Sequence, residues 1–352
     1  MPFLRNAWYV IGFQTEFTEK PIRRQILGEW MAIFRDENGT LCAVEDRCPH
    51  RFVPLSMGKV EGSQIRCGYH GLAFSGHDGK CTDRPMDDEG PIPPKLCIKA
   101  YPTVEKHLVV WAWMGAKEKA DPALIADFGL LDNPNFKSVP GYIHMKANQG
   151  LIADNLLDLS HVQFLHPHIA SQGDLSQFQN KVETEATAVW SRLYRPSVIP
   201  NMFQKKMWGS ASERGDSYGD VRFSVPGNIM AYTSVVEEGQ PWDSGLMVPS
   251  AHLLTPETEY STHYFWTAGR NALQEDEALD KILHDAVYEV FSTQDGPMIE
   301  AQQEAMGEST DFLAHNPVIL KPDAAGIRAR RMMNKLIREE QAGENLSAVA
   351  AE

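Results

Sequence analysis

Two short segments in the first hundred residues each carry a cysteine followed by a histidine. They are CPH at residues 48–50 and CGYH at residues 67–70, and 16 residues lie between them. Two thiolates and two imidazoles can hold a structural zinc ion or an iron–sulfur cluster. Zinc fingers usually place both cysteines before both histidines, whereas these segments alternate the two types. The alternation favours a [2Fe–2S] cluster in which the cysteines hold one iron and the histidines hold the other. The candidate ligands are Cys48, His50, Cys67 and His70.

The other three cysteines are Cys42, Cys81 and Cys97, so all five lie in the first hundred residues. An odd number argues against a disulfide framework in a chain that opens without a secretory signal. We expect these three to be small buried residues rather than ligands.

A second dense group of polar residues is DNLLDLSHVQFLHPH, residues 154–168. Its histidines His161 and His166 are five residues apart, which places them about 140° apart around an ideal helix. Pro167 disfavours helical geometry at the residue before it. We therefore expect the helix to unwind at His166, or to contain a π-type bulge, so that both imidazoles can face one point. His168 follows the proline and is expected to be an exposed loop residue.

Asp158 stands three residues before His161, a spacing that puts both side chains on one helix face. Its carboxylate could accept the second N–H of the imidazole and fix the tautomer. Two histidines are two-thirds of a mononuclear non-haem Fe(II) site, which needs one carboxylate as well and keeps positions open for O₂ and substrate.

The elements that must position these residues change in character along the chain. Residues 1–115 consist of short β-rich runs separated by turn signals such as Glu37-Asn38-Gly39, which indicates a small all-β domain. Residues 116–140 form a connecting segment, and 141–352 form a second domain with an antiparallel sheet flanked by helices. Helical spacing covers 275–293 and a final helix near 323–342, and Gly296-Pro297 is expected to break the first of these. The predicted fold class is α+β.

Composition excludes several classes of function. The chain has 352 residues, 33 basic and 47 acidic side chains and a net charge of −14, which argues against a nucleic-acid partner. No stretch approaches the roughly 18 apolar residues of a membrane span, so no membrane partner is expected. The first residues lack the pattern of a secretory signal, and we expect a cytoplasmic protein.

These motifs resemble those of Rieske non-haem iron oxygenases, in the branch of vanillate O-demethylase and dicamba demethylase. CPHRFVPLSMG, CGYHGLAF and D-N-L-x-D-x-x-H-x-x-x-x-H carry the resemblance, with support from RNAWYV and LTPETE. It implies a Rieske [2Fe–2S] cluster and an Fe(II) ion bound by His161, His166 and a carboxylate from a distant helix. The match places that carboxylate at Asp295, in FSTQDGPMIEAQQ, with Asp285 and Glu289 as alternatives.

The resemblance also implies how electrons travel. An oxygenase of this family receives them from NAD(P)H through a separate reductase or ferredoxin, and this chain has no G-x-G-x-x-G dinucleotide motif of its own. It further implies a head-to-tail homotrimer in which Asp158 bridges His70 of one chain and His161 of the next. Asn155 and Asp158 are accordingly expected to be catalytic.

The implied reaction is hydroxylation of an aryl methyl ether, with O₂ as oxidant and release of formaldehyde. The implied substrate is a methoxylated aromatic acid, and oxidation of a methyl, sulfonate or N-methyl substrate is the alternative. His252 is a candidate to meet a substrate carboxylate and Tyr232 a further pocket candidate, with Tyr194 and Met230 as possible neighbours. A Rieske electron carrier without oxygenase activity and a zinc-stabilised binding protein are the rival classes.

Overall fold

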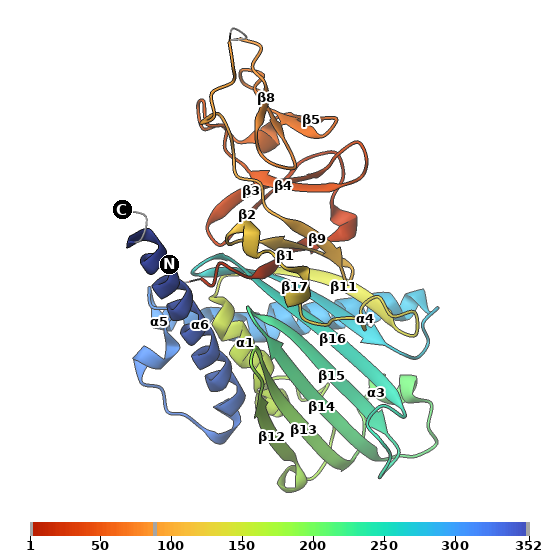
Figure 1. Ribbon diagram of the computed structural model, residues 1–352. Coiled ribbons are helices and arrows are strands. Elements are labelled where there is room, and N and C mark those ends of the chain that lie inside the picture. The colour runs from red at the N-terminus through yellow and green to blue at the C-terminus, as the bar shows by residue number, and fades with distance from the viewer. Residues whose placement is uncertain (1–2, 87–89, 350–352) are drawn as a thin grey trace. The chain divides into compact units, whose positions relative to one another are not determined.

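The computed structural model describes residues 3–86 and 90–349, with side chains up to residue 343. The chain divides into two compact units, one spanning Arg5–Ile125 and the other formed by the chain from Ala126 onward together with the N-terminal segment that ends at Leu4 (Figure 1). This division falls inside the segment 116–140 that the sequence marks as a connection. Among the described helices, none combines the length and apolar character that crossing a bilayer would need.

The N-terminal unit consists of β-sheet, as the turn-rich sequence predicts. Its three antiparallel sheets have the strand orders β1-β10-β9, β2-β3-β4 and β5-β6-β7-β8. The strands are β1 (Trp8–Phe13), β2 (Ile22–Ile26), β3 (Glu29–Arg35), β4 (Leu41–Glu45), β5 (Lys59–Glu61), β6 (Gln64–Arg66), β7 (Ala73–Ser75), β8 (Cys81–Asp83), β9 (Thr103–Lys106) and β10 (Val109–Trp113). Cys42 and Cys81 are buried as expected, whereas Cys97 is exposed and corrects the expectation for that residue.

The C-terminal unit is built on one seven-stranded antiparallel sheet with the order β11-β17-β16-β15-β14-β13-β12. Its strands are β11 (Lys137–Met145), β12 (Gln179–Thr184), β13 (Ala188–Val198), β14 (Gly215–Ser224), β15 (Asn228–Val236), β16 (Leu246–Thr258) and β17 (Ser261–Arg270). The predicted α+β class is therefore confirmed. Strand β11 begins three residues before the expected end of the connecting segment.

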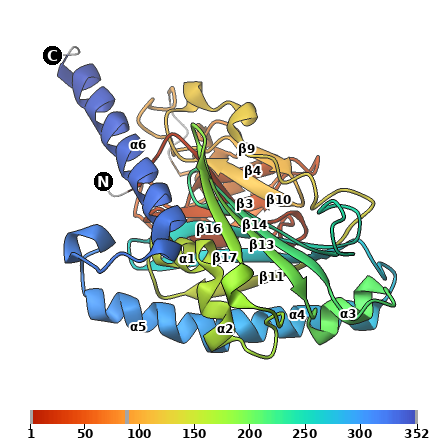
Figure 2. The same cartoon turned by 90° about the horizontal axis from the view of Figure 1, so that it is seen from below.

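The helices of the C-terminal unit are seen from below in Figure 2. They are α1 (Gln149–Leu157), α2 (Val162–Leu165), α3 (Met202–Trp208), α4 (Glu277–Glu289), α5 (Gly296–Met306) and α6 (Ala324–Val349). Apolar side chains of α1, α4 and α5 share one buried core with those of the sheet, including Leu157, Leu283 and Ile299 from the helices and Trp266 from β17. This core fixes α1 and α4, and these two helices carry or adjoin the site.

Candidate metal centre and its cavity

The chain from α1 to His166 is interrupted twice. Helix α1 ends at Leu157, and Asp158 is extended with φ −112° and ψ 98°. A single 3₁₀ turn, η5 (Leu159–His161), leads directly into α2, which ends before His166. The second interruption follows the prediction from Pro167. The first was not predicted, and because of it Asp158 and His161 do not share a helix face.

The extended Asp158 changes which of its atoms holds His161. The backbone carbonyl of Asp158 lies 2.7 Å from His161 Nδ1, whereas its carboxylate accepts the backbone N–H of Ser160 at 2.8 Å. A carbonyl can only accept, so the proton is on Nδ1 and the Nε2 lone pair is free to bind a metal. The expected fixing of the tautomer is present, but the main chain provides it.

Asp295 is positioned by a π-helical turn. This turn, η7 (Val290–Asp295), joins α4 to α5 without a break in helical geometry, and Gly296 has φ −52° and ψ −54°. The expected break at Gly296-Pro297 is therefore wrong. Pro297 stands at the start of α5, directly after the π-helical turn, and because the fixed φ of proline is compatible with a helical backbone the helix continues through it. The widened turn shifts the helical register and directs Asp295 inward.

Three candidate ligands meet at this turn. His166 Nε2 lies 3.0 Å and His161 Nε2 lies 3.5 Å from Asp295 Oδ1, and the two imidazole rings are nearly perpendicular. His166 and Asp295 are buried, with 2% and 1% of their surfaces exposed. The structure thus brings Asp295 together with two histidines, of which the nearer, His166, lies 129 positions before it in the chain.

Two further side chains orient this group. The side-chain amide oxygen of Gln294, Oε1, lies 2.6 Å from His166 Nδ1, and Asn155 Nδ2 donates to Asp295 Oδ1 at 3.1 Å. The proton of His166 is therefore on Nδ1 as well. Two imidazole lone pairs and a carboxylate then face one another with no proton between them, an arrangement that a divalent cation satisfies. The donor set of two nitrogens and one oxygen suits non-haem Fe(II).

The alternative carboxylates do not fit this site. Asp285 is exposed and pairs with Lys281 at 2.5 Å, and this contact lowers the pKa of the Asp285 carboxyl. Glu289 is also exposed, at the end of α4. His168 is exposed, as its position after Pro167 predicts.

A cavity of about 310 Å³ lies against the three candidate ligands. It is bounded by the inner face of the sheet, by α3 and α4, and by the segment 155–169, and most of its lining is apolar. Its aliphatic and aromatic lining includes Leu159, Phe203, Val221, Ile229, Leu283, Val287 and Phe291. A cavity of this size and character suits a small aromatic molecule.

The two Cys/His segments of the N-terminal unit have the same backbone hydrogen-bond pattern. Cys48 N–H donates to Val53 and Cys67 N–H donates to Leu72, the fifth residue on in each case. Each cysteine carbonyl accepts an N–H from the fourth residue on, which is Phe52 or Gly71. Both fourth residues have left-handed backbones, with φ of 62° and 76°. The chain therefore forms two matching loops, one for each Cys/His pair.

These loops bring the four candidate cluster ligands together in pairs. Cys48 and Cys67 are buried in one core, and burial, with the neighbouring Cys67 thiol, raises the pKa of Cys48. The rings of His50 and His70 lie 4.5 Å apart, and His50 is exposed while His70 is partly so. Buried cysteines and outward histidines fit a [2Fe–2S] cluster whose histidine-held iron is nearer the solvent.

Family comparisons agree with both sites. Residues 7–102 match the model of the Rieske [2Fe-2S] domain, and residues 145–339, more than half of the chain, match the vanillate O-demethylase oxygenase C-terminal domain. The chain belongs to the vanillate O-demethylase family of Rieske oxygenases. It is an aromatic monooxygenase with two cofactors, a [2Fe–2S] Rieske cluster and a mononuclear iron.

Relatives of this oxygenase act on several substrates. It is 33% identical to a dicamba O-demethylase oxygenase component of Stenotrophomonas maltophilia, over 97% of this chain and 100% of the relative. It is 34% identical to a chloroacetanilide N-alkylformylase oxygenase component of Rhizorhabdus wittichii, over 96% and 97% of the two chains. A toluene-4-sulfonate monooxygenase iron-sulfur subunit of Comamonas testosteroni is also 34% identical, over 97% and 99%.

A crystal structure of dicamba monooxygenase bound to 3,6-dichlorosalicylic acid superposes on the oxygenase with a TM-score of 0.91. The two chains are 32% identical, and the match covers 97% of this chain and 100% of the other. Another structure of that protein contains non-heme iron and dicamba.

His252 lines the cavity of the oxygenase, on β16. Its ring nitrogens are engaged with the Ser250 hydroxyl at 2.9 Å and the Tyr264 hydroxyl at 2.6 Å. Burial lowers the pKa of His252 to about 3 and raises that of Tyr264 well above its ordinary value. Both side chains are therefore uncharged at neutral pH, and His252, with both ring nitrogens engaged, presents no positive charge to a substrate.

The other three pocket candidates lie on the opposite face of the sheet. Ile229, Ala231 and Thr233 line the cavity, so the alternation of a strand turns Met230 and Tyr232 away from it. Tyr232 instead stacks on Trp190 with ring centroids 5.7 Å apart. On β13, the Tyr194 hydroxyl donates to Asp216 at 2.9 Å. Sequence alone does not reveal which alternate residues of a strand face inward. The neighbours of Tyr232 in the chain line the cavity, and Tyr232 itself does not.

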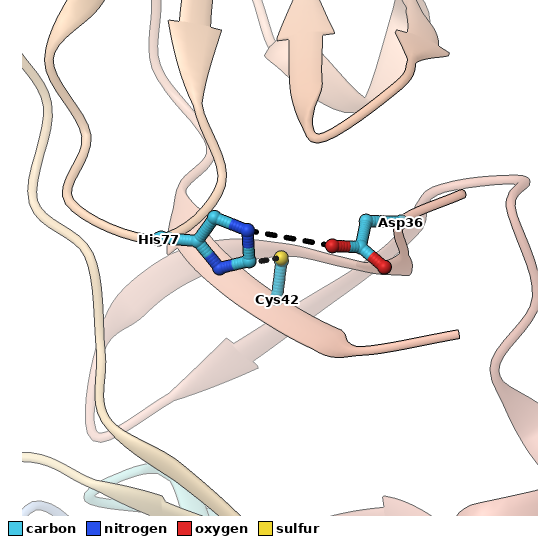
Figure 3. A group of neighbouring side chains, drawn as sticks. All are labelled: Asp36, Cys42 and His77. Atoms are coloured by element: carbon cyan, nitrogen blue, oxygen red, sulfur yellow. Dashed lines mark hydrogen bonds and ion pairs between the residues drawn. The ribbon is translucent and has the colours of Figure 1, made fainter. Parts of the chain in front are cut away.

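A further His/Cys/Asp group lies at the hairpin between β3 and β4 (Figure 3). Asp36 caps this turn by accepting the N–H groups of Asn38 and Thr40, and its other oxygen lies 3.3 Å from His77 Nε2. Cys42 Sγ lies 3.8 Å from His77 Nδ1. Burial raises the pKa of the Cys42 thiol to about 12, so it is a protonated donor rather than a metal-binding thiolate. We interpret the group as a hydrogen-bonded link between two turns.

Proposed function

We propose that this oxygenase is the terminal component of a system that oxidatively O-demethylates a methoxylated aromatic acid. The observation that carries the proposal is the convergence of His161, His166 and Asp295 at the wall of an apolar cavity. Such a cavity holds an aromatic ring by burying its faces and keeps bulk water from the reacting carbon.

The proposed reaction balances as a monooxygenation. It consumes one O₂, two electrons and two protons, inserts one oxygen atom into a methyl C–H bond and releases the other as water. The hydroxylated methyl ether is a hemiacetal, which loses formaldehyde and leaves a phenol. NAD(P)H would provide the electrons through a separate reductase or ferredoxin, because the chain has no G-x-G-x-x-G motif of its own.

In this proposal His161, His166 and Asp295 hold the mononuclear iron, and Cys48, His50, Cys67 and His70 hold the Rieske cluster. The bound iron supplies the activation of O₂. The protein's part is positional: Gln294 and the Asp158 carbonyl keep both imidazoles in the metal-binding tautomer, and the Asn155 amide orients the Asp295 carboxylate.

We further propose that Asp158 connects two subunits of a head-to-tail homotrimer, between His70 of one chain and His161 of the next. Two features support this role. The Asp158 carboxylate does not hold His161 within its own chain. Asp158 and His161 also line a common surface hollow of about 240 Å³, together with Met298 and Ile299.

N-dealkylation is the second candidate, favoured by the 34% identity to a chloroacetanilide N-alkylformylase. It requires the same hydroxylation of a carbon bound to a heteroatom. The two candidates therefore share one site and differ in the substrate.

The test is product analysis with the purified oxygenase, Fe(II), NADH and a compatible reductase. Methoxybenzoates and N-alkyl anilides are screened for formaldehyde or aldehyde release, with Asp295→Ala as the inactive control. We expect formaldehyde in proportion to NADH for at least one methoxybenzoate. NADH consumption without aldehyde from any methyl ether would reject O-demethylation.

A further inference from the structure

Arg195 is a partly buried arginine on β13 with no carboxylate partner among the described residues. Its Nη2 donates to Ser217 Oγ at 3.0 Å, and its Nε is buried without a hydrogen-bond partner. Burial alone lowers the pKa of Arg195, to about 10, and no acidic group opposes that shift. The guanidinium remains charged at neutral pH, and an unpaired charge in such a place is costly.

Two other arginines of the same unit are paired with acids. Arg192, three residues earlier on β13, contacts Glu183 at 2.8 Å and Asp220 at 2.7 Å. The fully buried Arg270 pairs with Asp280 at 2.5 Å. Arg195 has no such acidic partner, and an anion that is not part of the chain would complete its interactions.

The position of Arg195 indicates that this anion would come from the proposed substrate cavity. Arg195 pairs in register with Ser217 on β14, so both side chains lie on one face of the sheet. Gly219 and Val221 follow at alternate positions on that face, and Val221 lines the cavity. Thr233, the strand partner of Gly219, lines the cavity as well. Arg195 is thus on the same sheet face as these lining residues, beside the proposed substrate cavity.

Gly219, which has no side chain, lies between Arg195 and Leu159 of the cavity wall. A Cβ at Gly219 would lie 3.5 Å from Arg195 Nη2 and also 3.5 Å from Leu159 Cδ1. Leu159 lines the cavity two residues before the candidate ligand His161. An anionic group that reaches this space from the cavity can therefore meet the guanidinium.

The rest of the cavity provides no competing charge for an anion. Its lining includes no lysine or arginine in the described part of the chain. Its one titratable side chain outside the candidate ligands, His252, is uncharged at neutral pH. Asn201 and Gln204 also line the cavity, and they are bonded to each other in the capping box of α3.

We propose that Arg195 is the specificity-determining residue of this oxygenase and binds the carboxylate or sulfonate of an anionic aromatic substrate. This inference rests on the proposed function, because it assigns a substrate class to the same cavity. The planar guanidinium can hold such a group through two hydrogen bonds. The ring would then occupy the apolar cavity.

The test compares each anion with its neutral counterpart. Dissociation constants are measured by calorimetry for 2-, 3- and 4-methoxybenzoate, their methyl esters and 4-methoxybenzenesulfonate. The proteins are wild type, Arg195→Met, Arg195→Lys and the control Arg192→Met. We expect Arg195→Met to weaken binding of at least one anion about 10- to 100-fold, the loss of one charged hydrogen-bonded contact, and to leave ester binding within about twofold. Arg195→Lys is expected to be intermediate, and Arg192→Met to match wild type.

Comparing 4-methoxybenzoate with 4-methoxybenzenesulfonate distinguishes a carboxylate from a sulfonate substrate. The anion whose binding weakens more in Arg195→Met identifies the group that Arg195 recognises. Equal losses for acids and esters, or wild-type binding of acids no tighter than of esters, would overturn the role of Arg195. Formaldehyde release from the esters is followed in parallel. If no methyl ether is demethylated while acid binding still depends on Arg195, O-demethylation fails and the anion site stands. If the esters are demethylated and the anions do not bind, O-demethylation stands and the role of Arg195 fails.

Discussion

His166 Nε2 lies 3.0 Å from Asp295 Oδ1, although 129 residues separate the two along the chain. Both atoms are acceptors once Gln294 holds the proton of His166 on Nδ1. The contact therefore needs a cation to be favourable, and this need connects the folding of two distant helical segments to the binding of a metal.

Asp295→Ala removes the carboxylate from this contact. We expect the variant to lose most of its mononuclear iron and all detectable turnover, because two imidazoles alone bind Fe(II) weakly. The Rieske cluster, in the other unit, should keep its full signal in electron paramagnetic resonance. Iron analysis and the cluster signal measure both quantities. Asp285→Ala changes an exposed carboxylate on α4 and should match wild type. Full iron content in Asp295→Ala would show that another residue completes the site.

Asp158→Asn tests the proposed link between subunits. The backbone carbonyl of Asp158 holds His161, so the variant should retain both the iron and the cluster. We expect turnover to fall by about 100-fold, as for other residues that support metal ligands, because electron transfer between the centres would be impaired. Reduction of the cluster by the reductase should stay at the wild-type rate. A variant with wild-type turnover would exclude the bridging role.

His252 makes stability depend on pH. The folded state holds the pKa of His252 at about 3, against 6.5 for the free side chain, so its contribution is fully present above pH 6.5. As the pH falls below 6.5, the unfolded chain takes up a proton that the folded chain refuses, and stability is lost.

His252→Gln removes this titration. It should be less stable than wild type by about 1–3 kcal/mol at pH 7.5, because it disturbs the hydrogen bonds to Ser250 and Tyr264. Urea unfolding at pH 7.5, 6.5 and 5.5 should show that the difference in free energy of unfolding between wild type and His252→Gln becomes smaller as the pH falls. If this difference in free energy of unfolding stays constant or grows as the pH falls, His252 is not held neutral in the folded state.

Gly296 is required by the π-helical turn that positions Asp295. A Cβ at this position would lie 2.8 Å from the Phe291 carbonyl oxygen, and a backbone atom can move away only if the turn changes. We expect Gly296→Ala to cost about 1–3 kcal/mol and to weaken iron binding. Gly343→Ala is the control, because a Cβ at Gly343 in α6 would meet no atom within 4 Å. Thermal unfolding with and without Fe(II) compares the two. If Gly296→Ala is as stable as Gly343→Ala, the π-helical turn tolerates the alanine side chain.

The sequence was most informative where the chemistry is local. The Cys/His spacing predicts both loops of the N-terminal unit, and Pro167 predicts the end of α2 at His166. Resemblance to the family placed Asp295 beside the two histidines, which are far from it in the chain.

Predictions failed where backbone geometry decides the outcome. An extended Asp158 and a π turn before Gly296 depend on tertiary packing rather than on local propensity, and both determine where ligands point. Tyr232 was assigned to the wrong face because a strand reverses its facing with each residue. Gln294 and Arg195 belong to no sequence motif. The role of Gln294 is visible only from its hydrogen bond to His166, and that of Arg195 only from its lack of a carboxylate partner.

We propose that the oxygenase hydroxylates the methyl carbon of an aryl methyl ether. Turnover of the best methoxybenzoate under ¹⁸O₂ tests it directly, by mass spectrometry of the phenol and quantification of formaldehyde against NADH. We expect one formaldehyde per phenol and a phenol that keeps its original ether oxygen without ¹⁸O. A phenol that contains ¹⁸O, or that forms without formaldehyde, would contradict the account.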